Sequence, residues 1–269
     1  MQIIDLTTVK KEKIENHTSK GNQPKWHVDK KWYKADHMGY EALAEYVISE
    51  LLKKSNVEQF VAYDLIKIQY DGKESIGCVC DNFKGDYEML IPLERLHRQY
   101  FGKGLADALA PMENAEERLR YTVNFVEETT GIKDAGKYFA VLLALDAFFL
   151  NEDRHTNNIA VLRDEKTKTF RFAPIFDNGL ALLSDTNDYL LETDLYQNIE
   201  KVQAKPFDTN FDEQLNAAEE LYGSHLKFQF SSEDIYRILD DLKGCYDEKI
   251  LKRVEKLLLE QKRKYQYFF

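Results

Sequence analysis

The spacing of apolar residues divides the chain into two parts near residue 83. In the first part, a single helix is expected from about Gly39 to Ser55, because its apolar residues fall on one face. Residues 1–24 are polar apart from a small apolar start, and Asn16–Pro24 is rich in turn-forming residues, which predicts a loop there. Short apolar runs bounded by polar turns predict strands at Lys25–Val28, Trp32–Ala35, Val61–Tyr70 and Ser75–Cys80.

Beyond residue 84 the apolar residues recur with helical spacing. Residues 135–150 are apolar almost all round, which predicts a helix at the centre of the core, whereas residues 179–203 are polar and predict an irregular loop. The chain should therefore be an α+β protein with a small β-rich lobe, residues 1–83, and a mostly helical lobe, residues 84–269. The helices of this second lobe are expected at Pro92–Tyr100, Ala115–Thr130, Ala135–Leu150, Phe211–Tyr222, Ser231–Leu242 and Glu248–Tyr265.

Two polar loops beside apolar runs carry the candidate chemistry of the second lobe. Phosphoryl transfer needs a carboxylate that orients the attacking hydroxyl and oxygen ligands that hold magnesium on the nucleotide phosphates. Asp153 is the candidate for the first role, and Asn158 and Asp177 are the candidate metal ligands. Either loop alone would fit an ordinary polar turn. An Asp followed five residues later by Asn, and then by Asp-x-Gly after a strand, has the spacing of the kinase catalytic and metal-binding loops.

These two loops resemble those of the HipA-like serine/threonine kinases. The family patterns are Asn-x-Asp-x-His-x-x-Asn for the catalytic loop and Ala-Pro-x-x-Asp for the metal loop. The resemblance implies a two-lobed protein-kinase-like fold and an ATP- and Mg²⁺-dependent kinase that acts on a protein substrate. The first pattern is matched by Asn151, Asp153, His155 and Asn158, and the second by Ala173, Pro174 and Asp177.

The same resemblance extends to the nucleotide site of the first lobe. Gly21, Gln23 and Lys25 match a Gly-x-Gln-x-Lys phosphate loop that opens into a hairpin. Lys34, at the end of the second strand, is expected to contact the α- and β-phosphates and to pair with a helix glutamate. We choose Glu45 for that glutamate, because the residues after it resemble the helix of the family.

Three further assignments depend on position within this scheme. The segment from Asp81 to Phe83 would be the hinge between the lobes, where adenine is expected to bind. His155 follows the candidate base by two residues and is expected to brace the loop by hydrogen bonds rather than to transfer protons. In the family, a serine of the phosphate loop is autophosphorylated and the loop is expelled; Thr18 or Ser19 would take that position here.

Charge and cysteine content narrow the classes of protein further. The net charge of −10 argues against broad nucleic-acid binding and against adhesion to anionic membranes. The three cysteines form no CxxC pair, and no apolar run is long enough to span a bilayer, so we expect a cytoplasmic protein. The extra N-terminal subdomain of larger HipA-like kinases is expected to be missing. Either a separate small antitoxin-like partner chain supplies it, or nothing does.

Other functions remain open at this point. Asp-Arg-His-x-x-Asn also resembles the catalytic loop of phosphoinositide-type lipid kinases, and a non-catalytic nucleotide-binding or scaffold protein would keep the same fold. A metal-dependent hydrolase fits less well, because the six histidines form no His-x-His or His-x-x-x-His pair.

Overall fold

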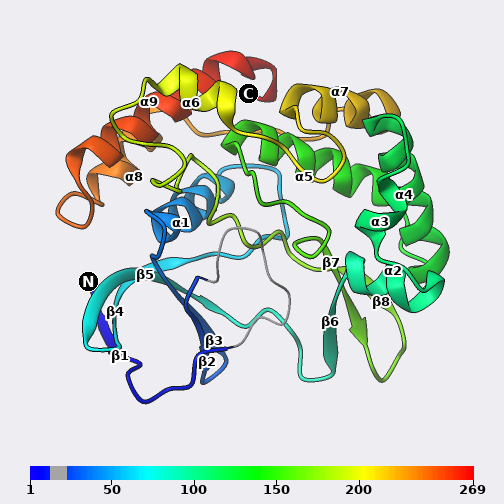
Figure 1. Ribbon diagram of the computed structural model, residues 1–269, viewed down its shortest axis with the longest axis horizontal. Helices are drawn as coiled ribbons and strands as arrows, with labels where there is room; N and C mark the ends of the chain where they lie inside the picture. Colours follow the sequence, from blue (N-terminus) through cyan, green and yellow to red (C-terminus); the bar gives the residue numbers. More distant parts are fainter. Residues whose placement is uncertain (13–22) are drawn as a thin grey trace.

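Five strands from the first 81 residues form one sheet in the order β1-β4-β5-β3-β2 (Figure 1). The structure is a computed structural model that describes residues 1–12 and 23–269. Strand β3, which carries Lys34, lies between β2 and β5 in antiparallel pairing, so its residues are held by hydrogen bonds on both sides. The strands of this sheet are β1 (Ile3–Asp5), β2 (Lys25–Val28), β3 (Lys31–Ala35), β4 (Asp64–Tyr70) and β5 (Lys73–Asp81).

Strand β1 lies in the small apolar start of the chain, where the sequence predicted no strand. It pairs in parallel with β4, with Ile4 opposite Ile68. A three-residue edge strand has no recognisable period of its own, and its partner lies more than 60 residues away in the sequence. Only the tertiary structure could therefore reveal it.

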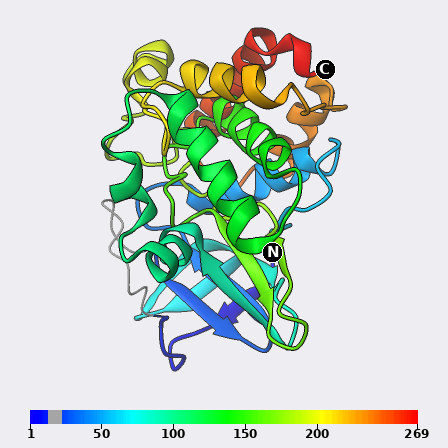
Figure 2. The ribbon, with the colours of Figure 1, turned by 90° about the vertical axis from the view of Figure 1, so that its right-hand side faces the viewer.

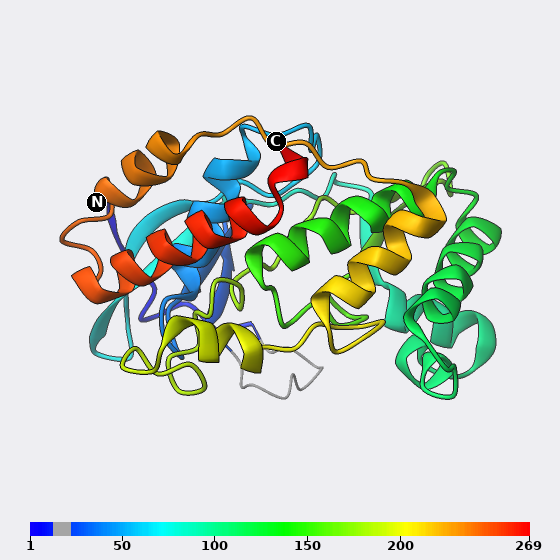
Figure 3. The same ribbon diagram turned by 90° about the horizontal axis from the view of Figure 1, so that it is seen from above.

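Helix α1 (Glu41–Leu52) packs on this sheet and also against the helical lobe (Figure 3). The hydroxyl of Tyr40, just before the helix, donates to the carbonyl oxygens of Leu182 and Leu183, each at 2.8 Å. Gly39 approaches the same segment so closely that a Cβ placed on it would lie 2.0 Å from the carbonyl oxygen of Ser184. The start of α1 is thus fixed against residues 182–184, which follow the metal loop.

The larger lobe is built from helices around a buried centre (Figures 1 and 2). Helix α5 is apolar on nearly all sides and packs against α4, α7 and α9, as its composition predicted. The helices of this lobe are α2 (Leu93–Phe101), α3 (Leu105–Leu109), α4 (Ala115–Thr130), α5 (Ala135–Phe149), α6 (Leu195–Lys201), α7 (Phe211–Tyr222), α8 (Ser232–Asp240), α9 (Glu248–Lys264) and the 3₁₀ turn η1 (Gln266–Phe268).

A second sheet, in the order β6-β7-β8, supports both polar loops. Its strands are β6 (Glu88–Pro92), β7 (Ala160–Asp164) and β8 (Phe170–Phe172). The catalytic loop enters β7, and the metal loop leaves β8. Because β7 and β8 are antiparallel, the start of one lies beside the end of the other, and the N–H of Ala173 donates to the carbonyl oxygen of Ala160 at 3.0 Å. This pairing brings the two loops to one edge of the sheet.

The expected α+β, two-lobed class is confirmed, with a few local differences. The interval 179–203, expected to be irregular, contains α6, whose first turn is capped by the carboxylate of Asp194. Strand β6 was not predicted either. It lies directly before α2, the only element that the sequence predicted in this region. No helix in the described part of the chain is both long and apolar enough to cross a membrane.

Candidate active site

Lys34 and Glu45 form a buried ion pair between β3 and α1. The Lys34 ammonium donates to Glu45 Oε1 at 2.5 Å, and the Lys34 and Glu45 residues are only 6% and 0% exposed. Burial acts to lower the pKa of Lys34, but the negative charges of Asp177 and Glu45 outweigh it and hold that pKa well above its ordinary value. The lysine therefore carries a permanent positive charge. Glu41 does not contact Lys34 in this way; its carboxylate accepts hydrogen bonds from the backbone N–H groups of residues 37–39.

Asp177 lies on the other side of the same lysine. Its Oδ1 is 2.8 Å from Lys34 Nζ, and its Oδ2 is 3.3 Å from Lys25 Nζ. Its φ angle of 59° places it in the left-handed region, which non-glycine residues seldom adopt. Such backbone strain persists where the surrounding contacts hold it, commonly at functional sites.

Asp153 lies in the catalytic loop with one carboxylate oxygen held and the other available. Asn158 Nδ2 donates to the Asp153 carbonyl oxygen at 2.8 Å and reaches Oδ2 at 3.3 Å. Among the described residues, Asp153 Oδ1 is buried without a hydrogen-bond partner; His155 Nε2 lies 3.7 Å from it and Lys205 Nζ lies 3.9 Å from it. An orphaned acceptor of this kind suits a group that receives a hydrogen bond from a substrate.

The two carboxylates have opposite electrostatic environments. Burial raises the pKa of Asp153, and the charge of Asp177 adds to the effect although His155 opposes it. Burial would also raise the pKa of Asp177, but the charges of Lys25 and Lys34 and their hydrogen bonds outweigh it and hold that pKa well below the ordinary value. The surroundings of Asp177 therefore favour its anionic form, which suits a ligand for a divalent cation, while those of Asp153 favour proton uptake.

A buried arginine joins the catalytic loop to the metal loop. Arg154 is 1% exposed and donates through Nε and Nη2 to the carboxylate of Asp146 on α5, at 3.0 to 3.1 Å. The same guanidinium donates to the carbonyl oxygens of Asn158 and Phe176 and to Asn178 Oδ1. One side chain thus fixes the relative position of residues 153–158 and 176–178.

Known structures resemble this arrangement over nearly the whole chain. The Helicobacter pylori proinflammatory kinase CtkA aligns with a TM-score of 0.63 and 18% sequence identity, over 99% of this chain and 96% of that one. HipA of the Shewanella oneidensis MR-1 toxin–antitoxin system, in its complex with HipB and operator DNA, aligns with a TM-score of 0.53 and 12% identity, over 94% of this chain and 66% of that one. The chain has a HipA-like kinase fold. No protein-family model and no curated protein matches the sequence.

In this HipA-like kinase fold, the residues present suit a magnesium nucleotide. Asn158 uses its amide nitrogen toward Asp153, which leaves its amide oxygen for a cation, and Asp177 supplies an anionic oxygen. Within residues 1–12 and 23–269 there is no cluster of three or more His, Cys, Asp or Glu side chains that could hold a metal. Magnesium does not require one, since it is typically bound by one or two protein oxygens together with phosphates and water.

The remaining predicted residues lie less centrally in the HipA-like kinase fold. Asp81 ends β5 with an exposed side chain 3.6 Å from Lys31 Nζ. Phe83 is half-buried, with its ring centroid 5.7 Å from that of Phe176, so the segment after β5 does run beside the metal loop. Gln23 is half-buried, two residues before β2. Gly21, Thr18 and Ser19 lie outside the described residues.

Sequence reasoning missed four residues of the HipA-like site. Asp146 could have been noticed, because it is the only acidic residue in the otherwise apolar helix α5. A lone buried carboxylate implies a buried cation nearby. Local sequence gave no signal for the other three, whose contacts come from distant parts of the chain. These residues are Arg154, Asn178 and Lys205.

Proposed function

We propose that this protein is an ATP- and Mg²⁺-dependent serine/threonine protein kinase. The observation that carries the proposal is that one lysine, Lys34, contacts both Glu45 and Asp177. Asp153 lies in the adjoining loop, and its Oδ1 accepts no hydrogen bond from the residues that the structure describes. Phosphoryl transfer depends mainly on positioning and on neutralising charge. A buried lysine, an anionic ligand and a nearby carboxylate supply both.

Each residue has a role that follows from its surroundings. Lys34, held charged by Glu45, would neutralise the phosphates, and Lys25 would contribute a second positive charge from β2. Asn158 and Asp177 would hold Mg²⁺, which would supply positive charge to offset that of the phosphates. Asp153 would accept the hydrogen bond, and then the proton, of the acceptor hydroxyl through Oδ1.

Two positive groups surround the carboxylate of Asp177. Lys25 and Lys34 both contact its carboxylate, so its charge is compensated in the structure as described. The same two ammonium groups would also contribute positive charge toward the phosphates of a nucleotide held at this site. The backbone N–H of His155 donates to the Asp153 carbonyl oxygen at 2.8 Å and so braces the catalytic loop, whereas the imidazole Nδ1 has no hydrogen-bond partner among the described residues.

The test is transfer of label from [γ-³²P]ATP in the presence of Mg²⁺ and a cell extract. Wild type should label protein, and Asp153→Asn, which keeps the shape of the side chain, should lose roughly 100-fold or more of the rate. Asp64→Asn, an exposed aspartate on β4, is the matched control and should retain the wild-type rate. Equal labelling by wild type and Asp153→Asn would contradict the assigned role.

The same experiment separates the competing functions. Vesicles that contain phosphoinositides are added in a parallel reaction, and label in lipid but not in protein would establish the lipid-kinase alternative. ATP binding by calorimetry without transfer to either acceptor would favour a nucleotide-binding scaffold.

We also propose that this protein binds a small partner chain. The support is the HipA neighbour, whose structure is a complex with HipB and operator DNA. The check is light scattering of the protein co-expressed with the product of the neighbouring reading frame; a mass equal to that of the chain alone would contradict the proposal.

A further inference from the structure

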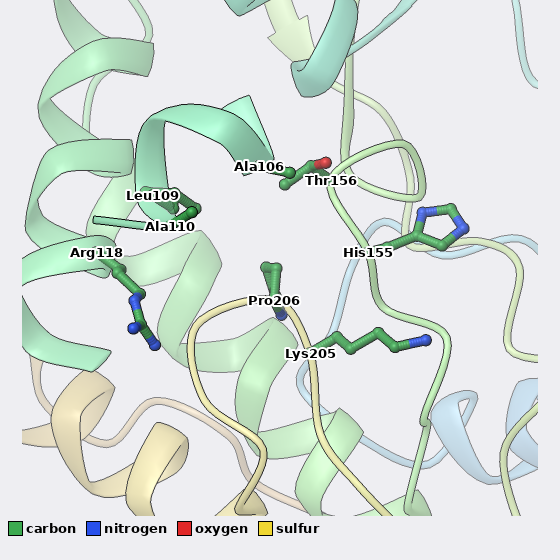
Figure 4. Close-up of a pocket in the computed structure, with 8 residues that line it drawn as sticks. All are labelled: Ala106, Leu109, Ala110, Arg118, His155, Thr156, Lys205 and Pro206. Atoms are coloured by element: carbon green, nitrogen blue, oxygen red, sulfur yellow. The ribbon is translucent and has the colours of Figure 1, made fainter. Parts of the chain in front are cut away.

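A small cavity lies directly beside the catalytic loop. It has a volume of about 260 Å³ and lies between α3, the start of α4, the catalytic loop and residues 205–206 (Figure 4). Sites for drug-sized ligands span about 300–1,000 Å³. This one is smaller, so it suits a single side chain rather than a nucleotide. The lining residues are Ala106, Leu109, Ala110, Arg118, His155, Thr156, Lys205 and Pro206.

The polar groups of the lining are already directed elsewhere. Arg118 donates to the carbonyl oxygens of Met112 and Phe207 at 2.7 and 2.8 Å. The Thr156 hydroxyl donates to Glu94 Oε2 at 2.8 Å. These groups therefore offer little to a polar occupant of the cavity.

The two remaining polar side chains turn toward the catalytic base. His155 Nε2 and Lys205 Nζ lie 3.7 and 3.9 Å from Asp153 Oδ1, and both side chains extend away from the α3 residues (Figure 4). The cavity is therefore lined by apolar groups, including the aliphatic parts of the longer side chains. The apolar lining residues are Ala106, Leu109, Ala110 and Pro206. Of the described lining residues, His155 has a buried Nδ1 without a hydrogen-bond partner, but its ring extends away from the α3 residues (Figure 4). An apolar occupant therefore gains from leaving water there, whereas a charged one would lose hydration for little return.

We infer that this cavity, the α3 cavity, binds an apolar side chain of the protein substrate close to the phosphorylated Ser or Thr. The inference rests on the proposed kinase function and deepens it. His155 and Thr156 line the cavity two and three residues after Asp153, and Lys205 touches both the cavity and the Asp153 carboxylate. An extended peptide advances about 3.3–3.6 Å per residue. The apolar residue should therefore lie one to three positions from the acceptor.

The experiment uses Ser-centred peptides in which each position from −3 to +3 carries in turn Leu, Ala, Glu or Lys. Initial rates with [γ-³²P]ATP and Mg²⁺ should show, at one position, a preference for Leu over Ala of roughly tenfold or more, and no preference for Glu. Equal rates for Leu and Ala at every position, or selection of Glu, would overturn the inference and leave the kinase proposal intact. No label in any peptide, together with no ATP hydrolysis, would reject the kinase function and this inference with it.

Two variants link the preference to the cavity. Ala106→Leu puts bulk into the cavity from an exposed position on α3, so it should reduce the Leu-to-Ala rate ratio to about twofold or less. Asp107→Leu adds an apolar side chain on the same helix outside the lining and should keep the ratio of wild type. Thermal melting confirms that both variants are folded. A Leu preference that survives Ala106→Leu would show that the selectivity arises elsewhere.

Discussion

Glu45 Oε2 accepts the backbone N–H of Asn178 at 2.9 Å, while Glu45 Oε1 accepts the Lys34 ammonium. One buried carboxylate therefore holds both the strand lysine and the residue that follows Asp177. Helix α1, the sheet and the metal loop are positioned together by this side chain. Its geometry leads to the first prediction.

Glu45→Gln should slow phosphoryl transfer by roughly 100-fold or more, because Lys34 loses one of its two anionic partners and would then be drawn toward the other, Asp177. The amide oxygen can still accept one hydrogen bond, so the free energy of unfolding should fall by only about 1–3 kcal/mol. Urea denaturation and [γ-³²P]ATP transfer measure the two effects. Glu50→Gln, on the same helix beside Lys53 near the surface, is the control and should change neither. A Glu45→Gln enzyme with the wild-type rate would show that the pair does not position Lys34.

Asp177→Asn should lower the rate of phosphoryl transfer by about 100-fold or more without unfolding the protein. The change removes one anionic oxygen from the proposed Mg²⁺ site but keeps the shape of the side chain. Circular dichroism and the transfer assay at several Mg²⁺ concentrations test this, with Asp64→Asn as the control. Full activity in Asp177→Asn would place the metal elsewhere.

Asp146→Asn should destabilise the fold by roughly 3–5 kcal/mol, because Arg154 would remain buried without its countercharge. The double variant Asp146→Leu with Arg154→Met should recover much of that stability, since a buried ion pair can be replaced by apolar residues of similar volume.

The double variant should nevertheless remain slow in transfer. Arg154 also holds the carbonyl oxygen of Phe176 and the side chain of Asn178, and methionine cannot replace those hydrogen bonds. Urea midpoints together with transfer rates separate the two effects. A double variant with full activity would mean that Arg154 is needed only to balance charge.

Asp36 should make stability depend on pH near neutrality. Burial, assisted by the charge of Glu41, raises the pKa of Asp36 to about 8, although hydrogen bonds from the Ala42 N–H and the Tyr246 hydroxyl oppose the shift. Between about pH 4 and pH 8 the folded state then holds a proton that the unfolded state releases, so stability falls as pH rises through this range.

Asp36→Asn should remove that fall, so its stability relative to wild type should increase from pH 5 to pH 8.5. Urea denaturation at several pH values is the measurement, with Asp64→Asn as the control that keeps the wild-type slope. Parallel profiles for wild type and Asp36→Asn would contradict the assignment.

Autophosphorylation is expected on Thr18 or Ser19, which belong to the segment outside the described residues. A phosphate adds about −1.5 to −2 charges, which the phosphates of ATP would repel, so activity should fall as the label accumulates. Mass spectrometry of protein incubated with ATP is the measurement, and Thr18→Ala with Ser19→Ala is the control. Absence of phosphate on residues 16–25, while another substrate is labelled, would reject this regulation.

The sequence by itself determined the local elements and the two loops. Helix α4 begins and ends where its periodicity predicted, and α7 does too, because helical hydrogen bonds connect residues four positions apart. The spacing from Asp153 to Asn158 is local in the same sense. These features depend only on residues that are close together in the chain, so they can be predicted from the sequence.

Only the tertiary structure decided which distant groups meet. The pairing of β1 with β4, the contact of Arg154 with Asn178 and the approach of Lys205 to Asp153 each join segments separated by more than twenty residues. Burial gives these contacts their energetic weight, since an ion pair or an unpartnered oxygen matters far more away from water. No local pattern encodes that burial, so the α3 cavity and the arginine that joins the loops became visible only in the folded chain.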